Sequence, residues 1–338
     1  MARVRLADVA RHAGVSMKTV SNVVHDFPHV SPTTRERVQL AIAELGYRPN
    51  AMGRGLATGR TGLLALAFAD VSIPYFAELA RVVSGIAAAR GYRLLLEQTD
   101  GALEEERAIV SSTEAGLVDG VVFQPSTMSS VEIAQHRADV PLVLLGEQPA
   151  PLSVDHVMID NLDAAAAATR HLAALGRRRI AFFGHEGDRP SGTSRLRLHG
   201  YQRGLEQEDL RLDMELLVPS AAISARAAYE SFGAALDAGL RVDGVVCRDD
   251  LAAIGALRAL QERGYRVPDD VALTGWDDVA MASFTQPALT TVRPDTVALA
   301  TAALDLLEER IDGYEGLGRH RIVPFELVVR ESAPFPAA

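Results

Sequence analysis

Short apolar runs that alternate with helical stretches dominate the sequence from residue 61 onward. Strands that are covered by helices on both faces of a parallel sheet are apolar throughout, whereas half-exposed strands alternate apolar and polar residues. Helical stretches fill the gaps between the runs, for example at 162–175 and 251–263. The pattern therefore predicts an α/β body built on doubly wound parallel sheets. The runs are LLALAF, RLLLE, DGVVF, LVLLG, HVMID, RIAFF, DGVVC and VALTG.

Three short helices are predicted in the first 45 residues. The first has its apolar side chains on one helical face, and these are Leu6, Val9, Ala10 and Ala13. Gly14 ends this helix, and Ser16 can cap the next one by accepting a backbone N–H from its first turn. Ser31 can cap the third helix, with Pro32 at the first helical position and Gly46 as the stop.

The charge of the chain is divided unevenly along its length. Residues 1–60 hold nine Arg or Lys and four Asp or Glu, although the whole chain has a formal net charge of -10. Phosphate neutralisation needs local positive charge, so this distribution indicates that a polyanion would contact only the N-terminal part. On charge alone, a solvated basic terminus without a ligand stays open as an alternative.

Composition excludes several classes of site. Cys247 is the single cysteine, which rules out an internal disulfide and a multi-cysteine zinc site and favours a reducing cytoplasm. The N-terminus has no apolar signal region, and no run of 18 apolar residues is present, so we expect no membrane partner. Lys18 is the single lysine, which leaves no phosphate-binding GxxxxGK loop. We predict no cofactor and no metal.

The turn at 13–16 has the spacing of a helix-turn-helix motif, whose second helix lies in the DNA major groove. The exposed positions at the start of that helix are Met17, Lys18, Ser21 and Asn22. Lys18 can donate to guanine O6 and N7, Asn22 can pair with adenine, and Met17 can contact a thymine methyl group. These residues predict base contacts, although a three-helix bundle without a ligand would also fit them.

Hydroxyl side chains gather near the predicted helix starts. They are Ser16, Thr19, Ser31 and Thr34. Hydroxyls and the free N–H groups of a first helical turn suit phosphate oxygens, so we predict that these four residues contact the DNA backbone.

The segment LADVARHAGVSMKTVSNVVHDFPHVSPTTRERVQLAIAELGYRPNAMGRGLATGRTG resembles the head and hinge of the LacI/GalR family of bacterial regulators. The resemblance continues through RTGLLALAFADVSIPYFAEL, GYRLLL, VDGVVF, DDLAAIGALRAL, VPDDVALTGWDD, LTTVRPD and FELVVRES, and so covers nearly the whole chain. It implies an all-α helix-turn-helix head and a periplasmic-binding-protein-like α/β body of two doubly wound parallel-sheet subdomains. It also implies a sequence-specific DNA-binding regulator, a repressor of carbohydrate-utilisation genes whose operator affinity is controlled by a sugar effector.

The resemblance also implies where the domains begin and end. The DNA-binding head would occupy 1–48, the hinge 49–60, and the effector-binding and dimerisation domain 61–338. Within that domain, one subdomain would comprise 61–161 with 292–322, and the other 162–290 with 323–332. Three crossovers would join the two subdomains, with the ligand cleft between them.

In this family the hinge forms a helix only on DNA, and Leu56 stands at the position that wedges into the minor groove. Asn50 and Arg54 would contact DNA from the same segment. Two residues of the head depart from the family pattern. Asn22 stands where Arg is common, which favours an adenine contact over a guanine contact, and Arg5 stands where a capping Thr or Ser is usual.

Candidate effector-binding residues follow the ends of the predicted strands, where ligands bind in sheets of this kind. Carboxylates accept hydrogen bonds from sugar hydroxyls, Arg donates to them, and an aromatic ring covers the apolar side of a sugar ring. Arg197 lies where the family keeps a ligand-clamping arginine. The mixture favours a neutral sugar, because an acidic cleft repels phosphate. The candidates are Asp70, Tyr75, Phe76, Gln124, Glu147, Asp160, Arg197, Asp249, Trp276 and Asp277.

Other interpretations of these residues stay open at this point. Tyr75 and Phe76 could simply pack the cleft wall, and paired aspartates could be helix caps. Asp249 replaces the usual Asn, Pro294 replaces a polar residue, and Ile223 lies where some relatives stack an aromatic ring. These departures suggest a sugar or polyol that is recognised differently from the best-known effectors.

Two other functions, a solute-binding protein and an enzyme, also have to be weighed against the sequence. A solute-binding protein without a DNA role would not begin with a helix-turn-helix and would need an export signal. An enzyme could use paired carboxylates, but HExxH, GxSxG and clustered metal ligands are all missing from the sequence. The C-terminal FELVVRESAPFPAA has no leucine heptad for a tetramer, so a two-fold dimer on a palindromic DNA operator is expected.

Overall fold

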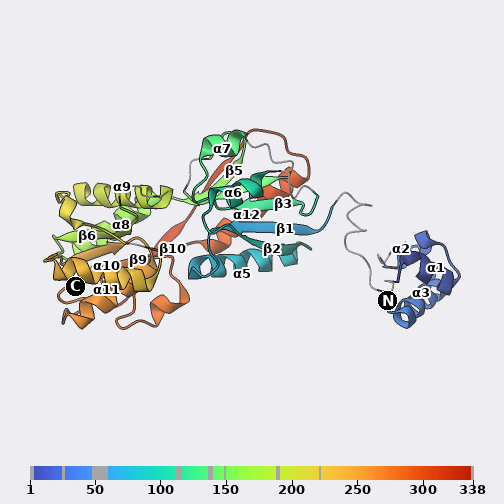
Figure 1. The fold of residues 1–338 in the computed structure, drawn as a ribbon, viewed down its shortest axis with the longest axis horizontal. Helices are drawn as coiled ribbons and strands as arrows, with labels where there is room; N and C mark the ends of the chain where they lie inside the picture. The colour runs from blue at the N-terminus through green and yellow to red at the C-terminus, as the bar shows by residue number, and fades with distance from the viewer. Residues whose placement is uncertain are drawn as a thin grey trace. The chain divides into compact units, whose positions relative to one another are not determined.

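The structure is a computed structural model of the chain (Figure 1). It consists of two compact units, residues 1–61 and 62–338. The residues that it describes are 4–24, 27–47, 60–111, 116–135, 140–147, 150–187, 191–220 and 222–335.

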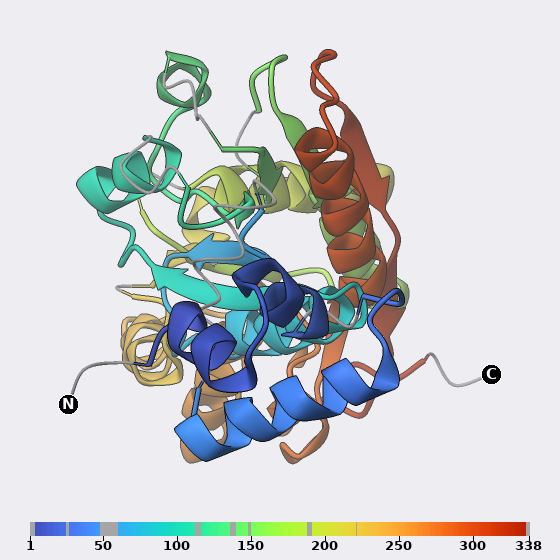
Figure 2. The ribbon, with the colours of Figure 1, turned by 90° about the vertical axis from the view of Figure 1, so that its right-hand side faces the viewer.

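The described residues of the first unit form three helices, and Figure 2 shows them in blue. They are α1 (Leu6–Ala13), α2 (Met17–Val24) and α3 (Pro32–Leu45). Gly14 and Gly46 follow α1 and α3 with φ of 62° and 61°, a left-handed conformation that glycine adopts at low cost. The predicted helices of the head are confirmed. Arg5 donates its backbone N–H to the Asp8 carboxylate, so α1 is capped by Asp8 and not by a hydroxyl.

A small apolar core holds the three helices together. Each helix contributes residues three or four positions apart, which therefore lie on one face. The buried residues are Val9, Ala10, Ala13, Val20, Val23, Val38 and Ala41.

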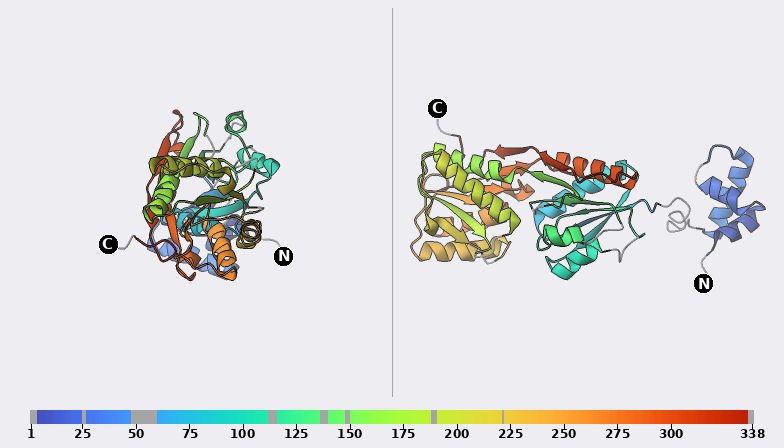
Figure 3. Two further views of the ribbon diagram at one scale, coloured as in Figure 1. Left: turned by 90° about the vertical axis from the view of Figure 1, so that its left-hand side faces the viewer. Right: turned by 90° about the horizontal axis from the view of Figure 1, so that it is seen from above.

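The second unit contains two six-stranded sheets, which the right-hand view of Figure 3 shows as separate halves. The first sheet has the order β11-β5-β4-β3-β1-β2, and all of its strand pairs are parallel. Its strands are β1 (Leu63–Phe68), β2 (Arg93–Gln98), β3 (Gly120–Phe123), β4 (Leu142–Leu145), β5 (Asp155–Ile159) and β11 (His320–Val323). The helices between or beside them are α5 (Pro74–Ala89), α6 (Leu103–Val110), α7 (Ser130–Gln135) and α12 (Thr296–Ile311).

The second sheet has the order β12-β10-β9-β8-β6-β7, and only β12 runs antiparallel to its neighbour. Its strands are β6 (Ile180–His185), β7 (Leu217–Pro219), β8 (Gly244–Cys247), β9 (Ala272–Trp276), β10 (Thr290–Pro294) and β12 (Phe325–Val328). Its helices are α8 (Asn161–Ala174), α9 (Gly192–Gln207), η2 (Met214–Leu216), α10 (Ala225–Asp237), α11 (Asp250–Glu262) and η3 (Ala280–Ser283).

The side chains of β1 explain why the strands are continuous apolar runs. Leu64, Leu66 and Phe68 point to one face of the sheet and join the core with residues of α5 and α12. Ala65 and Ala67 point to the other face and join a core with residues of α6 and α7. Successive residues of a strand alternate between faces, and here helices cover both faces. The doubly wound parallel architecture is therefore confirmed.

The chain crosses between the subdomains after β5, after β10 and after β11. Two boundary expectations need correction. Residues 292–294 belong to β10 of the second sheet, not to the first subdomain, because Val292 pairs with Trp276 of β9 and with Leu327 of β12. Val323 belongs to the first sheet, where it pairs with Ile159.

Strands β7, β10, β11 and β12 were not among the predicted apolar runs, and β12 is half-exposed with Glu326 in its middle. β7 has three residues, β10 begins with two threonines, and β11 is an exposed edge strand that begins with His320 and Arg321. Short or polar strands lack the continuous apolar signal. No helix in the described ranges is long and apolar enough to cross a membrane.

Candidate functional site

The surface of α2 carries the residues predicted to read DNA bases. Met17 is 55% exposed, and Lys18 is also exposed, whereas Ser21 and Asn22 are half-buried farther along the helix. Val20 and Val23 anchor the opposite face of α2 in the core. The first turn of α2 therefore presents its polar side chains outward on a fixed helix, as base contacts require.

The hydroxyl side chains at the helix starts have structural partners. Ser16 accepts the backbone N–H of Thr19 at 3.1 Å, and Ser31 accepts that of Thr34 at 3.3 Å. Ser31 also donates its hydroxyl to Thr34 Oγ1 at 2.8 Å. These bonds fix the starts of α2 and α3, and contact with DNA phosphates stays a prediction. Asn50, Arg54 and Leu56 lie outside the described residues.

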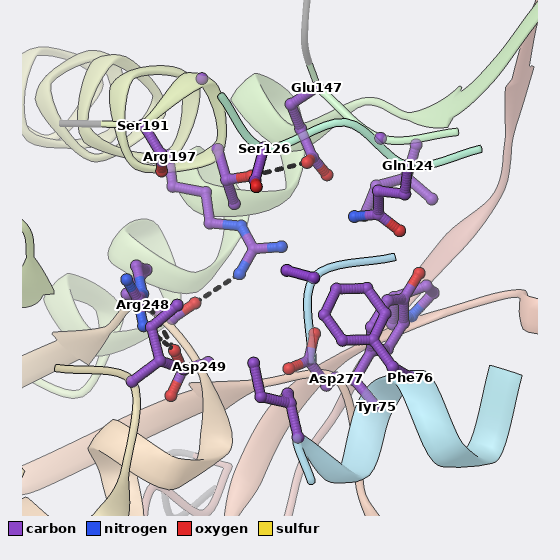
Figure 4. A pocket seen from close by; sticks show the side chains of 18 of the residues that line it. Tyr75, Phe76, Gln124, Ser126, Glu147, Ser191, Arg197, Arg248, Asp249 and Asp277 are labelled. Carbon is purple, nitrogen blue, oxygen red and sulfur yellow. Dashed lines mark hydrogen bonds and ion pairs between the residues drawn. The ribbon is translucent and has the colours of Figure 1, made fainter. Parts of the chain in front are cut away.

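A cavity of about 230 Å³ lies between the two sheets, and residues from both subdomains line it. It is found at the carboxyl ends of the strands, where ligands of such sheets bind. Figure 4 shows the Arg197 guanidinium pointing into the space between Glu147, Gln124 and Asp277. The predicted residues that line the cavity are Tyr75, Phe76, Gln124, Glu147, Arg197, Asp249 and Asp277.

Three predicted residues do not line this cavity. Asp70 accepts the backbone N–H of Ser72 at 2.8 Å and shapes the turn before α5. Asp160 caps α8 by accepting the N–H of Asp163 at 2.9 Å. Trp276 is 1% exposed and lies beneath Arg197, so it supports the cavity from behind.

Arg197 is held on three sides. Its Nε donates to Asn161 Oδ1 at 3.0 Å, and its Nη1 donates to the carbonyl of Arg248 at 2.5 Å. Its guanidinium carbon lies 3.9 Å from the centre of the Trp276 ring, a cation–π contact. Burial lowers the pKa of Arg197, and the neighbouring carboxylates oppose that shift. No described residue accepts a hydrogen bond from Nη2, which leaves this nitrogen available to a ligand.

Glu147 lies on the opposite wall, two residues after the end of β4. Its Oε1 accepts from Asn161 Nδ2 at 3.0 Å, and its Oε2 accepts from the Thr193 hydroxyl at 2.6 Å. Thr193 belongs to α9 of the second subdomain, whereas Glu147 belongs to the first. The carboxylate therefore joins the two walls of the cleft.

Asp277, Tyr75 and Gln124 are cavity residues with unpaired side-chain polar groups, and Gln124 Oε1 is buried without a partner among the described residues. Among the described residues, none makes a hydrogen bond with the Asp277 carboxyl or the Tyr75 hydroxyl. Burial raises the pKa of Asp277 well above its usual value, while the charge of Arg197 opposes that shift. Burial also raises the pKa of Tyr75, and the charges of Asp277 and Glu147 add to that effect. Half-buried polar groups that lack a protein partner are satisfied by a ligand or by water.

Asp250, behind the cavity, holds the turn that carries Asp277. The backbone at Asp277 and Asp278 has φ of 104° and 52°, where side-chain-bearing residues are strained. Asp250 Oδ2 accepts the N–H of Val279 at 2.9 Å, and Oδ1 accepts the Thr291 hydroxyl at 2.7 Å. Burial raises the pKa of Asp250 to about 7.

Asp249 has both oxygens occupied. Oδ1 caps α11 by accepting the N–H of Ala252 at 2.7 Å, and Oδ2 accepts Nε and Nη2 of Arg248 at 2.9 and 2.5 Å. Arg248 also donates from Nη1 to Glu186 at 2.9 Å. Asp249 therefore lines the cavity as the partner of an arginine, and Arg248 brings donor groups to this wall.

Sequence reasoning missed several residues of the cavity wall. They are Ser126, Glu186, Ser191, Thr193 and Arg248. Arg248 and Glu186 directly follow β8 and β6, so the strand-end rule that selected Asp249 could also have selected them. Thr193 lies inside α9 and carries no such signal.

Comparisons with known proteins agree with this architecture. A family model described as bacterial regulatory proteins, lacI family, matches residues 5–50, and one described as a periplasmic binding protein-like domain matches residues 169–333. The ribose operon repressor of Halalkalibacterium halodurans is 32% identical over 329 residues, covering 97% of this chain and 96% of that protein. The chain belongs to the LacI family. It is a DNA-binding transcriptional regulator.

Solved structures of LacI-family proteins resemble this chain over nearly its full length. The lac repressor dimer bound to operator and the anti-inducer ONPF has a TM-score of 0.86 at 27% identity. The complex of the transcriptional regulator CelR with cellobiose has a TM-score of 0.71 at 31% identity. Each comparison covers 98% of this LacI-family chain and 100% of the other.

Proposed function

We propose that this LacI-family regulator represses carbohydrate-utilisation genes as a homodimer and is released from its operator by a neutral sugar that binds between the subdomains. One observation carries the sugar assignment. Arg197 Nη2, the Tyr75 hydroxyl and the Asp277 carboxyl belong to residues that line one cavity, and no described residue satisfies them. The hydroxyl groups of a polyhydroxylated ligand can accept a hydrogen bond from Arg197 Nη2 and can donate one to the Asp277 carboxyl.

The charges around the cavity support a neutral ligand over a phosphorylated one. Glu147, Glu186, Asp249 and Asp277 line the cavity, against the two guanidinium groups of Arg197 and Arg248. Arg248 is already paired with two of these carboxylates. A phosphate would therefore meet an excess of negative charge in a cleft where solvent screens charges only weakly. The names of two relatives, a ribose operon repressor and a regulator in complex with cellobiose, point to the same ligand class.

The DNA-binding half of the proposal concerns α2 and the hinge. Lys18 and Asn22 would contact base edges, and Met17 would contact a thymine methyl group. Leu56 would enter the minor groove between two half-sites. The solved lac repressor, which is a dimer bound to its operator, supports the same arrangement for this chain.

An exposed apolar surface on η3 supports the dimer. Met281 is 59% exposed, and Phe284, directly after η3, is 81% exposed. This segment contacts the other subdomain, because the N–H of Ala280 donates to Glu78 of α5 at 2.9 Å. Large apolar side chains at this exposure are stabilised by burial in an interface. We assign Met281 and Phe284 to the dimer interface.

Control of DNA binding requires only that the sugar prefers one arrangement of the two subdomains. Residues of both subdomains line the cavity, so a bound sugar contacts both and its affinity depends on their relative position. That preference would change the spacing of the paired heads. Because the cavity serves binding and not turnover, we propose that the protein is not an enzyme.

A screen of ligands followed by a DNA-binding assay tests the proposal. We expect that cellobiose, D-ribose or another neutral sugar raises the melting temperature, while the corresponding sugar phosphates have no effect. The sugar that binds should weaken operator binding at fixed salt and should be recovered unchanged after incubation. Consumption of the sugar, or stabilisation by the phosphates alone, would contradict the proposal.

A further inference from the structure

Asn161 occupies an unusual position in the wall of the cleft. It is the first residue of α8 and follows β5, where the chain first crosses from one subdomain to the other. Its side chain is completely buried. It does not line the cavity, yet it contacts two residues that do, Glu147 and Arg197.

The two ends of the Asn161 amide make opposite hydrogen bonds. Oδ1 accepts from Arg197 Nε at 3.0 Å, and Nδ2 donates to Glu147 Oε1 at 3.0 Å. Nδ2 also lies 3.2 Å from the carbonyl oxygen of Ile159, to which it donates. An amide offers an acceptor and a donor on one planar group, whereas a carboxylate offers acceptors alone. Asn161 therefore satisfies a cation and an anion at once without adding charge.

These two partners come from different subdomains. Glu147 follows β4 of the first sheet, and Arg197 belongs to α9, which packs with α8 on the second sheet. Figure 4 shows Glu147 and Arg197 approaching the cavity from different elements. A single buried side chain at the crossover thus sets the distance between the acceptor group of one wall and the donor group of the other.

We propose that Asn161 is a positioning residue for effector binding, which holds Glu147 and Arg197 in register across the cleft. This inference rests on the function proposed above, since it assigns a role within the same site. Asn161 would act through its two partners and would not contact the sugar. An effector that displaces Arg197 or Glu147 also changes the length of their hydrogen bonds to Asn161. Binding in the cavity is thereby linked to the arrangement of the subdomains.

The positioning role can be tested by exchanging the donor and the acceptor of the Asn161–Glu147 hydrogen bond. In Asn161→Asp, two carboxylates would face each other where a donor and an acceptor now meet, and like charges at this distance repel. In Asn161→Asp combined with Glu147→Gln, the donor moves to residue 147 and the bond reforms with reversed polarity. The total charge of that double variant equals that of the original chain.

The experiment measures affinity for cellobiose and D-ribose by calorimetry in the original chain, N161D, E147Q and the double variant. N161D should bind about 10- to 100-fold more weakly, as expected for the loss of one hydrogen bond to a charged group. In the E147Q background, adding N161D should weaken binding by only about 3-fold, because the coupled pair regains its bond and only the bond to the Ile159 carbonyl is lost. Asp163→Asn, two positions farther along α8, serves as the matched control and should leave the affinity unchanged.

Thermal unfolding shows whether each variant folds, and operator binding shows whether its DNA-binding function is intact. If N161D weakens sugar binding equally in both backgrounds, or leaves it unchanged, the positioning role is wrong while the proposed function stands. If N161D does not fold, the comparison of E147Q with the double variant decides the question alone. If the original chain binds neither cellobiose nor D-ribose nor any other neutral sugar, the proposed function fails and this inference fails with it.

Discussion

Replacement of Arg197 by lysine keeps the positive charge in the cleft but removes the planar guanidinium. The original side chain donates to Asn161 Oδ1 and to the carbonyl of Arg248, and it stacks on Trp276. A lysine ammonium is a point donor on a flexible stem and lacks the forked geometry of arginine. It can replace one of the two hydrogen bonds and leaves the other acceptor buried without a partner.

The expected loss in the free energy of unfolding follows from these contacts. A hydrogen bond to a charged group contributes about 1.5–3 kcal/mol, and the weakened contact with Trp276 adds about 0.5–1 kcal/mol. Since Arg197 is 7% exposed, solvent does little to compensate. We therefore expect Arg197→Lys to lower the free energy of unfolding by about 2–4 kcal/mol. It should also weaken sugar binding by at least about tenfold, because no donor then occupies the position of Nη2.

Urea unfolding and calorimetric titration with the sugar that binds the original chain measure both effects. Arg203→Lys is the matched control, since Arg203 is exposed on the same helix, and it should change stability by no more than about 0.5 kcal/mol. Native stability together with native sugar affinity in Arg197→Lys would refute the argument that the three contacts fix this side chain for ligand binding.

Three further predictions concern the DNA surface, the dimer and pH. Lys18→Ala and Asn22→Ala should each relax preference at one base pair per half-site by about 1–3 kcal/mol in competition assays with altered duplexes, whereas equal loss on every sequence would identify phosphate contacts instead. Phe284→Glu should produce monomers in sedimentation, unlike Phe335→Glu on the exposed C-terminal segment, and an unchanged dimer would remove η3 from the interface. Burial raises the pKa of Asp250 from 3.8 to about 7, so its stabilising contribution is complete below pH 3.8 and is lost as pH rises through 7. The difference corresponds to about 4 kcal/mol, and Asp250→Asn should flatten the fall in stability between about pH 4 and 7, which thermal unfolding can follow.

The sequence indicated the strands with fully apolar runs because burial on both faces removes the polar alternation. β1 shows this directly, since Leu64 and Ala65 face different cores and both are buried. β10 and β11 escaped prediction for the opposite reason. Thr290 and Thr291 are completely buried but form hydrogen bonds through their hydroxyls, and β11 lies at a sheet edge where Arg321 and Ile322 are exposed.

The family pattern and the strand-end rule selected several residues that line the cavity, and they failed where a local hydrogen bond turns a side chain toward its own helix. Tyr75, Glu147, Arg197 and Asp277 line the cavity, as expected from the family pattern and the strand ends. Asp160, by contrast, is turned to its own helix as a cap. A sequence does not distinguish a carboxylate that caps a helix from one that is free for a ligand, because both follow a strand.

The burial of Trp276 outside the cavity could have been predicted from the sequence. Trp276 is the last residue of β9, and Asp277 follows it. Successive side chains of a strand point to opposite faces, so both residues could not enter the same cavity in the same way. Trp276 packs with the core beneath Arg197, and Asp277 lines the cavity.

Selection of DNA from a random duplex pool, followed by binding measurements with and without sugar, tests the account most directly. We predict that the full-length protein enriches inverted repeats with half-sites one helical turn apart and prefers them to random DNA at least a thousandfold, at the lower end of the usual range of about 10³ to 10⁷. Adding the sugar that stabilises the protein should weaken that binding at constant salt. A protein that shows no preference for any palindromic duplex, with or without sugar, would contradict the account.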